Sequence, residues 1–127
     1  MNRFLFLALR IIVAVILIQT LRFKFLAHPD SVFIFTQAGL EPAGRIIIGL
    51  LELIAAFLII FPKTVWLGAG LTLGIISGAI FLHLTKIGIE VQGDGGSLFY
   101  TAILIFVLSS IILWNERKKI PVVGNNI

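Results

Sequence analysis

Long apolar runs follow one another along the chain with short polar breaks between them. Each of four runs is close to the roughly 20 residues that an α-helix needs to cross a hydrocarbon layer about 30 Å thick. They are Phe4–Leu26, Pro42–Phe61, Val65–Leu84 and Leu98–Trp114. The pattern predicts an all-α fold, an integral membrane four-helix bundle that occupies residues 1–115 as a single domain, followed by a basic and polar tail, residues 116–127.

The segment between the first two runs predicts a further, shorter helix. Pro29 and Asp30 are typical of a helix start and Gly39 of a helix end, so we expect this helix over Pro29–Leu40. Its four consecutive apolar residues, Val32-Phe33-Ile34-Phe35, are unusual for a solvated loop. We therefore expect a short helix between the first two spans that lies in the membrane interface or folds back onto the bundle and caps it.

The composition is that of a membrane protein. Of 127 residues, 59% are hydrophobic and 13% charged, and the mean hydropathy of +1.13 is too high for a soluble domain of this size. The first run is longer than a signal-peptide core and is interrupted by Arg10, so we expect it to be retained. The sequence has no cysteine, which excludes disulfides, thiolate metal sites and a thiol relay.

The basic residues lie at the ends of the runs and in the tail. This placement favours anionic lipid headgroups, together with the lipid bilayer, as partners and argues against nucleic acid. If the runs alternate in direction, five Lys and Arg residues share the side of both termini and four share the opposite side. The two groups are Arg3, Lys63, Arg117, Lys118 and Lys119, and Arg22, Lys24, Arg45 and Lys86. Under the positive-inside rule we expect both termini in the cytoplasm.

Alternating runs also bring the first and third connections to the same membrane face. The residues gathered there are Arg22, Lys24, His28, Asp30, Glu41, Arg45, Lys86, Glu90 and Asp94. The second connection is only Pro62-Lys63-Thr64, so we expect binding chemistry on the first face. Asp94, inside the turn Gly93-Asp94-Gly95-Gly96, has two candidate roles: a cap for the fourth run or an ion pair with a nearby base.

One carboxyl group falls deep inside the second run. Glu52 lies about 15 Å from Pro42 along a helix axis, at about 1.5 Å per residue, and therefore close to mid-membrane. Two arginines are candidate partners: Arg10 on the first run and Arg45 two turns away on the same helix. Two interpretations stay open, an ion pair that fixes helix register and a carboxylate that carries a proton or binds a ligand.

The third run combines small residues with a histidine. Gly70, Gly74 and Gly78 recur every four residues and form a ridge that another helix can approach closely. We expect the ridge to pack inside the bundle; the alternative is a homodimer or a partner membrane protein bound through it. For His83 a hydrogen bond to a backbone carbonyl or a neighbouring side chain is favoured over contact with a metal, haem or quinone. No motif spacing supports a haem held by His83 and His28.

Four motifs in this chain occur together in a known order. They are Arg22-Phe23-Lys24, Glu41-Pro42-Ala43-Gly44-Arg45 followed by Gly49 and Glu52, Ser77-Gly78-Ala79-Ile80-Phe81-Leu82-His83-Leu84, and Asp94-Gly95-Gly96. In this order the chain resembles the DoxX-like family of small four-span bacterial membrane proteins, over most of its length except the tail. The resemblance implies a bundle in the bacterial cytoplasmic membrane. Because the family includes a subunit of thiosulfate:quinone oxidoreductase and membrane partners of oxidative-stress systems, it also implies a quinone-linked redox association.

Together these patterns predict a redox-associated membrane protein that holds a lipophilic ligand, such as a quinone, in the outer half of the bundle. The predicted ligand-binding residues are Lys24, Arg45, Glu52, His83, Lys86 and Asp94. The sequence contains no complete catalytic constellation, so an accessory subunit is favoured over a self-sufficient enzyme. The alternatives are a non-enzymatic assembly or scaffold subunit for a partner membrane protein, and a minimal proton-coupled carrier that uses Glu52.

Overall fold

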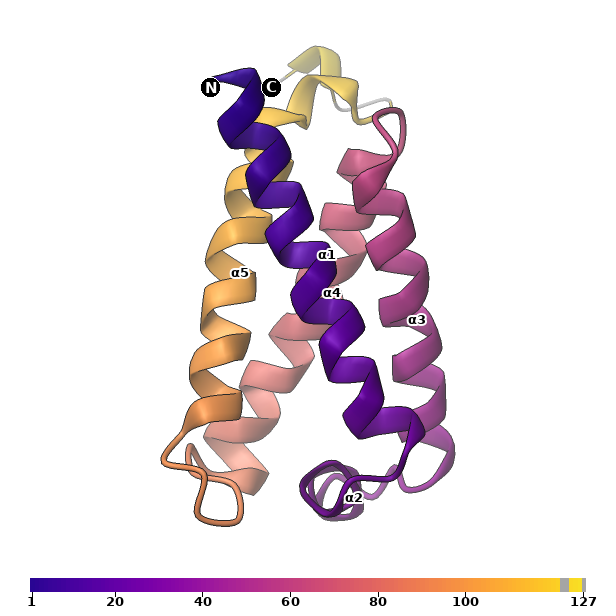
Figure 1. Cartoon of the computed structure of the whole chain (residues 1–127), viewed down its shortest axis with the longest axis vertical. Coiled ribbons are helices and arrows are strands. Elements are labelled where there is room, and N and C mark those ends of the chain that lie inside the picture. The colour runs from indigo at the N-terminus through magenta and orange to yellow at the C-terminus, as the bar shows by residue number, and fades with distance from the viewer. Residues whose placement is uncertain (122–123, 127) are drawn as a thin grey trace.

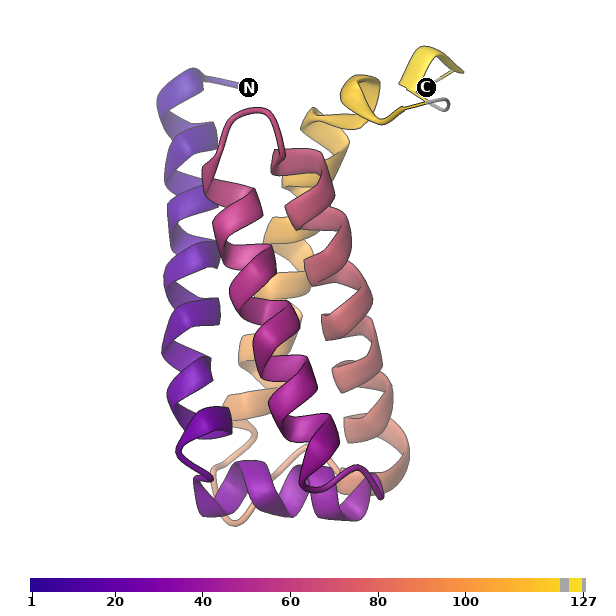
Figure 2. The same ribbon diagram turned by 90° about the vertical axis from the view of Figure 1, so that its right-hand side faces the viewer.

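The computed structural model describes residues 1–121 and 124–126. Four long helices form an up-and-down bundle: α1 (Arg3–Phe25), α3 (Ala43–Ile60), α4 (Val65–Leu82) and α5 (Ser97–Asn115). A shorter helix, α2 (Pro29–Gln37), lies across one end of the bundle (Figures 1 and 2). The described residues contain no strand. The predicted all-α four-helix bundle with a short helix between the first two spans is confirmed.

All four long helices are long and apolar enough to cross a membrane. Only 28% to 33% of the most apolar window of each helix is buried inside the protein. Large apolar side chains such as Phe4, Phe57 and Phe81 are instead exposed along the outer faces. A bundle that faces water would carry polar residues there. The chain is therefore a multi-pass membrane protein.

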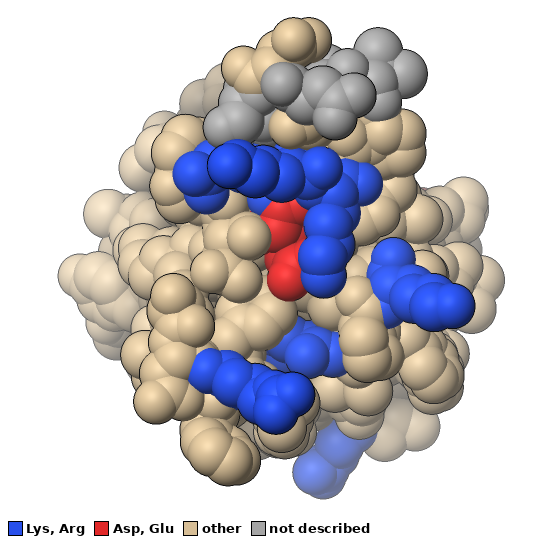
Figure 3. All heavy atoms as spheres, turned by 90° about the horizontal axis from the view of Figure 1, so that it is seen from above, with Lys and Arg blue, Asp and Glu red and all other residues tan. Residues whose placement is uncertain are grey.

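The connections between helices gather at two ends of the bundle (Figure 1). One end, which we call the terminal end, carries the N-terminus, the α3–α4 connection and the tail. The other, the α2 end, carries α2 and the loop that leads into α5. This is the arrangement expected from alternating runs. Figure 3 shows Lys and Arg side chains spread over the terminal end, with a small acidic area between them.

The tail begins where α5 ends. Glu116 is buried there, and its Oε2 lies 3.0 Å from Nζ of Lys119. The described part of the tail forms two 3-10 turns, η2 (Arg117–Lys119) and η3 (Gly124–Asn126). The predicted basic and polar tail also includes residues 122–123 and 127, which lie outside the described residues.

Toward the α2 end the long helices lie as two pairs, α1 with α3 and α4 with α5, whereas toward the terminal end α4 also packs against α3 (Figure 1). The pairs meet near the terminal end, where Gly68 allows α4 to approach the backbone of α3 closely. A Cβ atom at Gly68 would lie 2.6 Å from the backbone nitrogen of Ile59. Toward the α2 end the two pairs separate (Figure 1). Close backbone contact at a small residue is how helices associate in lipid, where no hydrophobic drive brings them together.

The glycine ridge of α4 does not pack inside the bundle, so that prediction was wrong. A Cβ atom at Gly70, Gly74 or Gly78 would meet no atom within 4 Å. The ridge lies on the side of α4 away from Thr72, which is fully buried. The spacing of four places the three glycines together on a helix face, but it does not determine whether that face is turned inward.

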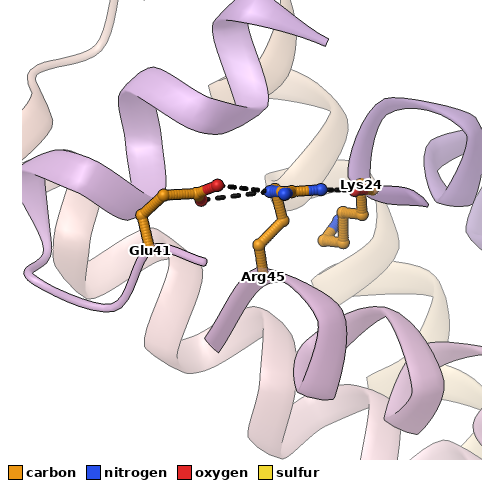
Figure 4. Close-up of polar contacts among 3 residues, drawn as sticks. All are labelled: Lys24, Glu41 and Arg45. Carbon is orange, nitrogen blue, oxygen red and sulfur yellow. Dashed lines mark hydrogen bonds and ion pairs between the residues drawn. The ribbon is translucent and has the colours of Figure 1, made fainter. Parts of the chain in front are cut away.

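Two buried arginines join α1 to α3, one at each end of the pair. Arg10 on α1 donates from Nε to the Ile59 carbonyl at 2.9 Å, and its guanidinium also binds the Ile60 carbonyl. Arg45 on α3 donates to the Lys24 carbonyl in the last turn of α1 (Figure 4). The last carbonyls of a helix lack partners within it and carry its negative dipole end. Each helix therefore caps the C-terminus of the other.

Gly68 offers a test of the α3–α4 contact. We expect Gly68→Ala to destabilise the protein by about 1–3 kcal/mol, because the added methyl group meets backbone rather than a flexible side chain. Gly70→Ala is the matched control, since its methyl group has open space and alanine favours helix. Thermal unfolding of both variants in detergent micelles measures the difference. Equal unfolding midpoints would contradict the close contact.

Arg10 offers a test of the reciprocal caps. Arg10→Met should lower the free energy of unfolding by about 1–3 kcal/mol, because two carbonyl groups at the end of α3 lose their buried donor. Arg3→Met, which removes an exposed arginine from the same helix, is the control and should have little effect. Chemical unfolding in micelles measures both. A wild-type midpoint for Arg10→Met would show that water satisfies these carbonyls equally well.

Candidate functional site

A cavity of about 440 Å³ lies between the two helix pairs, in the half of the bundle near α2. Small-molecule sites usually measure roughly 300–1,000 Å³, so this cavity has the size of a ligand pocket. All five α-helices contribute to its walls, which are mostly apolar. Typical wall residues are Leu17 on α1, Phe35 on α2, Ile48 on α3, Ile76 on α4 and Ile105 on α5.

A buried ion pair supplies charge to this apolar cavity. Nζ of Lys24 lies 2.9 Å from Oε1 of Glu52, and the two side chains are 16% and 5% exposed. Thr20, one turn before Lys24 on α1, donates from Oγ1 to Oε2 of Glu52 at 3.0 Å. Pairing and hydrogen bonding offset the cost of removing the carboxylate from water. An ammonium has three N–H donors, so Lys24 is able to donate to a further group in the cavity.

This pairing corrects the prediction that Arg10 or Arg45 is the partner of Glu52. Arg10 lies near the terminal end, where its guanidinium binds the carbonyls at the end of α3. Arg45 shares a helix with Glu52, but its Nε lies 2.8 Å and 3.0 Å from the two carboxylate oxygens of Glu41 (Figure 4). Both arginines are thus engaged at helix ends, and Lys24 pairs with Glu52 instead.

His83 lines the cavity from α4. It begins a single π-helical turn, η1 (His83–Ile87), and such turns are frequent at functional sites. Its Nδ1 lies 2.9 Å from the Gly88 carbonyl, which can only accept, so Nδ1 carries the proton. The favoured hydrogen bond to backbone is confirmed. The ring packs edge-on against Phe99, and Nε2 is the nitrogen that remains for a ligand.

The structure brings together half of the six predicted ligand-binding residues. The cavity is lined by Lys24, Glu52 and His83. Lys86 is exposed to the surroundings, Arg45 joins α1 to α3, and Asp94 belongs to the loop before α5. His28 does not line the cavity either; its Nδ1 accepts the N–H of Asp30 at 3.1 Å and caps α2.

Asp94 organises the loop that leads into α5. Its Oδ1 accepts the N–H groups of Val91 at 2.9 Å and Gly96 at 2.7 Å, and its Oδ2 accepts that of Leu98 at 3.2 Å. Burial raises the pKa of this carboxyl, but the three backbone donors and nearby His83 outweigh burial and hold the pKa below its ordinary value of 3.8. Of the two predicted roles, the structure shows the cap.

Three polar residues of the cavity, Thr20, Ser31 and Thr101, were not predicted from the sequence. Thr20 binds Glu52, and Ser31 lines the cavity from α2 with 5% of its surface exposed. The spacing of four between Thr20 and Lys24 could have identified the first, since it places both on one face of α1. Ser31 had no comparable signal, because it reaches the cavity only through the fold of α2 across the bundle.

Metal-ligating side chains and similarity to known proteins are two further properties of the site. In the described part of the chain, no group of three or more His, Cys, Asp or Glu side chains could hold a metal ion. Comparisons with family models, curated proteins and solved structures found no match for this chain. The DoxX-like resemblance stays a prediction. Fold and site define a small four-span membrane protein with an ion pair in the wall of an intramembrane cavity.

Asp94 gives a pH-dependent test of the loop. Because its folded-state pKa is lowered, the ionised carboxylate stabilises the fold above about pH 4, and this contribution is lost as the pH falls through the folded pKa. Asp94→Asn should therefore be less stable by about 1 kcal/mol at neutral pH and less sensitive to acid. Glu90→Gln, an exposed change in the same loop, is the control. Parallel pH profiles for Asp94→Asn and wild type would refute the cap.

Proposed function

We propose that this protein binds a lipophilic molecule with a polar headgroup, such as a quinone, in the cavity between its helix pairs. The observation that supports this function is the Lys24–Glu52 ion pair in the cavity wall. A charged pair inside a membrane is costly, and residues of this kind usually mark a functional site. Arg10 and Arg45 also align α1 with α3, so helix register does not depend on this pair alone.

The polar groups of the cavity suit a quinone ring. Lys24 offers an N–H donor to a ring carbonyl, and Nε2 of His83 offers an acceptor to a ring hydroxyl in the reduced form. The apolar walls accommodate the rest of the ring. With no cysteine in the sequence, the chain lacks a redox group of its own. Its role is therefore to bind and orient the quinone, as an accessory protein that works with a redox partner.

The proposal also includes the membrane in which the protein lies and its orientation there. The DoxX-like resemblance favours the bacterial cytoplasmic membrane. The Lys and Arg side chains of the terminal end favour cytoplasmic placement of both termini (Figure 3). With this orientation, the cavity lies in the outer half of the bundle, which is the half that faces away from the cytoplasm.

A second candidate function is an assembly subunit. It is favoured by the open face at Gly70, Gly74 and Gly78, which a helix of a partner membrane protein or of a second copy could approach closely. This function predicts a partner or dimer in native membranes that is lost in Gly70→Leu. A proton-coupled carrier is a third candidate; it uses Glu52 and predicts loss of transport in Glu52→Gln.

Binding of menadione, a quinone ring without a long tail, tests the proposed function. In lipid nanodiscs it should raise the unfolding temperature of the wild type. Lys24→Met and His83→Ala should each weaken binding by about tenfold, equivalent to about 1.4 kcal/mol. Lys86→Met is the matched control, since this lysine is exposed and outside the cavity. Because Lys24→Met leaves a lone buried carboxylate, the double variant Lys24→Met with Glu52→Leu checks that loss of binding is not loss of fold.

Two results would contradict the proposal. The first is menadione binding by Lys24→Met and by the double variant at wild-type strength. The second is protein purified from native membranes in which mass spectrometry detects no quinone or other lipophilic molecule, together with no thermal shift on adding menadione.

A further inference from the structure

The cavity that contains the Lys24–Glu52 pair continues to the outer surface of α4. Gly74 and Gly78 line this cavity, although both are exposed. Gly74 is two residues from fully buried Thr72, so it lies on nearly the opposite side of the helix from the core. A single cavity therefore reaches from a buried carboxylate to the face of α4 that is turned away from the bundle.

The outer opening lies within the span of α4, not at its end. Gly74 is close to the middle of Val65–Leu82, so its surroundings in a bilayer are hydrocarbon. A Cβ atom at either glycine would meet nothing within 4 Å, so the missing side chains keep the opening clear. Ile75 and Leu82 line the cavity beside the glycines and make this part apolar.

Helix α2 covers the water-facing end of the cavity, and the nearby α1–α3 seam is closely packed. Helix α2 lies across the water-facing end (Figure 2), and its Ser31 and Phe35 are buried in the cavity wall. Along the seam, the ring of Phe25 lies over Gly49, where a Cβ atom would be only 2.7 Å away from it. The opening on α4 is thus a route into the cavity from the bilayer.

We propose that Gly74 and Gly78 form a lateral portal through which the tail of a single-chain amphiphile leaves the cavity, while its headgroup lies at Lys24 and Glu52. This inference rests on the proposed function and specifies the class of ligand: a molecule with one long apolar chain, dissolved in the bilayer. The charged pair suits a polar head, the glycine-lined opening suits a chain without bulky branches, and hydrocarbon lies outside it. A water-soluble substrate would need a route through α2.

The test compares two quinones with the same ring. Menadione has no tail, whereas a menaquinone carries an isoprenoid tail on that ring. In nanodiscs, Gly78→Leu should weaken binding of the menaquinone by about tenfold or more and change binding of menadione by less than about twofold. Gly70→Leu is the matched control: it lies on the same ridge with the same open space but outside the cavity, and should bind both quinones normally. Gly74→Leu provides a second portal variant.

Each outcome has a defined meaning. If folded Gly78→Leu and Gly74→Leu bind the menaquinone as wild type does, the portal is wrong and the headgroup site stands. If both variants bind the two quinones equally weakly, the portal is also wrong, because the substitutions then do not act on the tail. If all three leucine variants bind the menaquinone normally but no longer form a dimer or bind a partner, the ridge is a packing surface for another helix and the portal is wrong. A wild type that binds neither quinone overturns the proposed function and the portal together.

Discussion

The reciprocal arginine caps of α1 and α3 determine how the rest of the chain is arranged. The step from Arg10 to Lys24 along α1 equals the step from Ile59 back to Arg45 along α3, so both caps belong to one antiparallel register. Helices in lipid gain little from hydrophobic burial against one another, and specific polar contacts and close packing fix their alignment. With α1 and α3 fixed, the short α3–α4 connection and the contact at Gly68 position α4, and α5 follows as its hairpin partner.

This register also explains why the Lys24–Glu52 pair deserves a functional interpretation. A single intramembrane ion pair is often needed to align two helices, and that was one of the two interpretations of Glu52 from the sequence. Here alignment is carried by guanidinium groups at both ends of the helix pair, whereas Glu52 lies between them and faces a cavity. Replacing such a pair with apolar residues costs little or even stabilises a fold, so its presence in a cavity wall supports the proposed ligand site.

The sequence predicted the elements of this fold well and their contacts less well. Run length and apolar content identify a span directly, so the four helices and α2 were predicted close to their observed bounds. Contacts depend on how far each helix is rotated and at what depth it meets its neighbour. A spacing of four residues correctly predicts that Gly70, Gly74 and Gly78 share one helix face. It does not predict whether that face is turned toward the bundle. For the same reason, the depth of Glu52 in the membrane predicted Arg10 as an ion-pair partner, although its partner is Lys24.

Packing at one end of the bundle and empty volume at the other have a common cause. Gly68 draws α4 against α3 near their short connection, so the helices can diverge from that point, and α2 lies across the end where they have separated (Figure 1). Among the small residues that α4 contributes to the cavity wall, Ala79 takes up little room, and Gly74 and Gly78 leave the outer opening clear. An apolar cavity of this size at membrane depth borders the hydrocarbon of the bilayer, and its wall contains a charged pair. Those two surroundings together suit an amphiphile better than they suit either lipid tails or water alone.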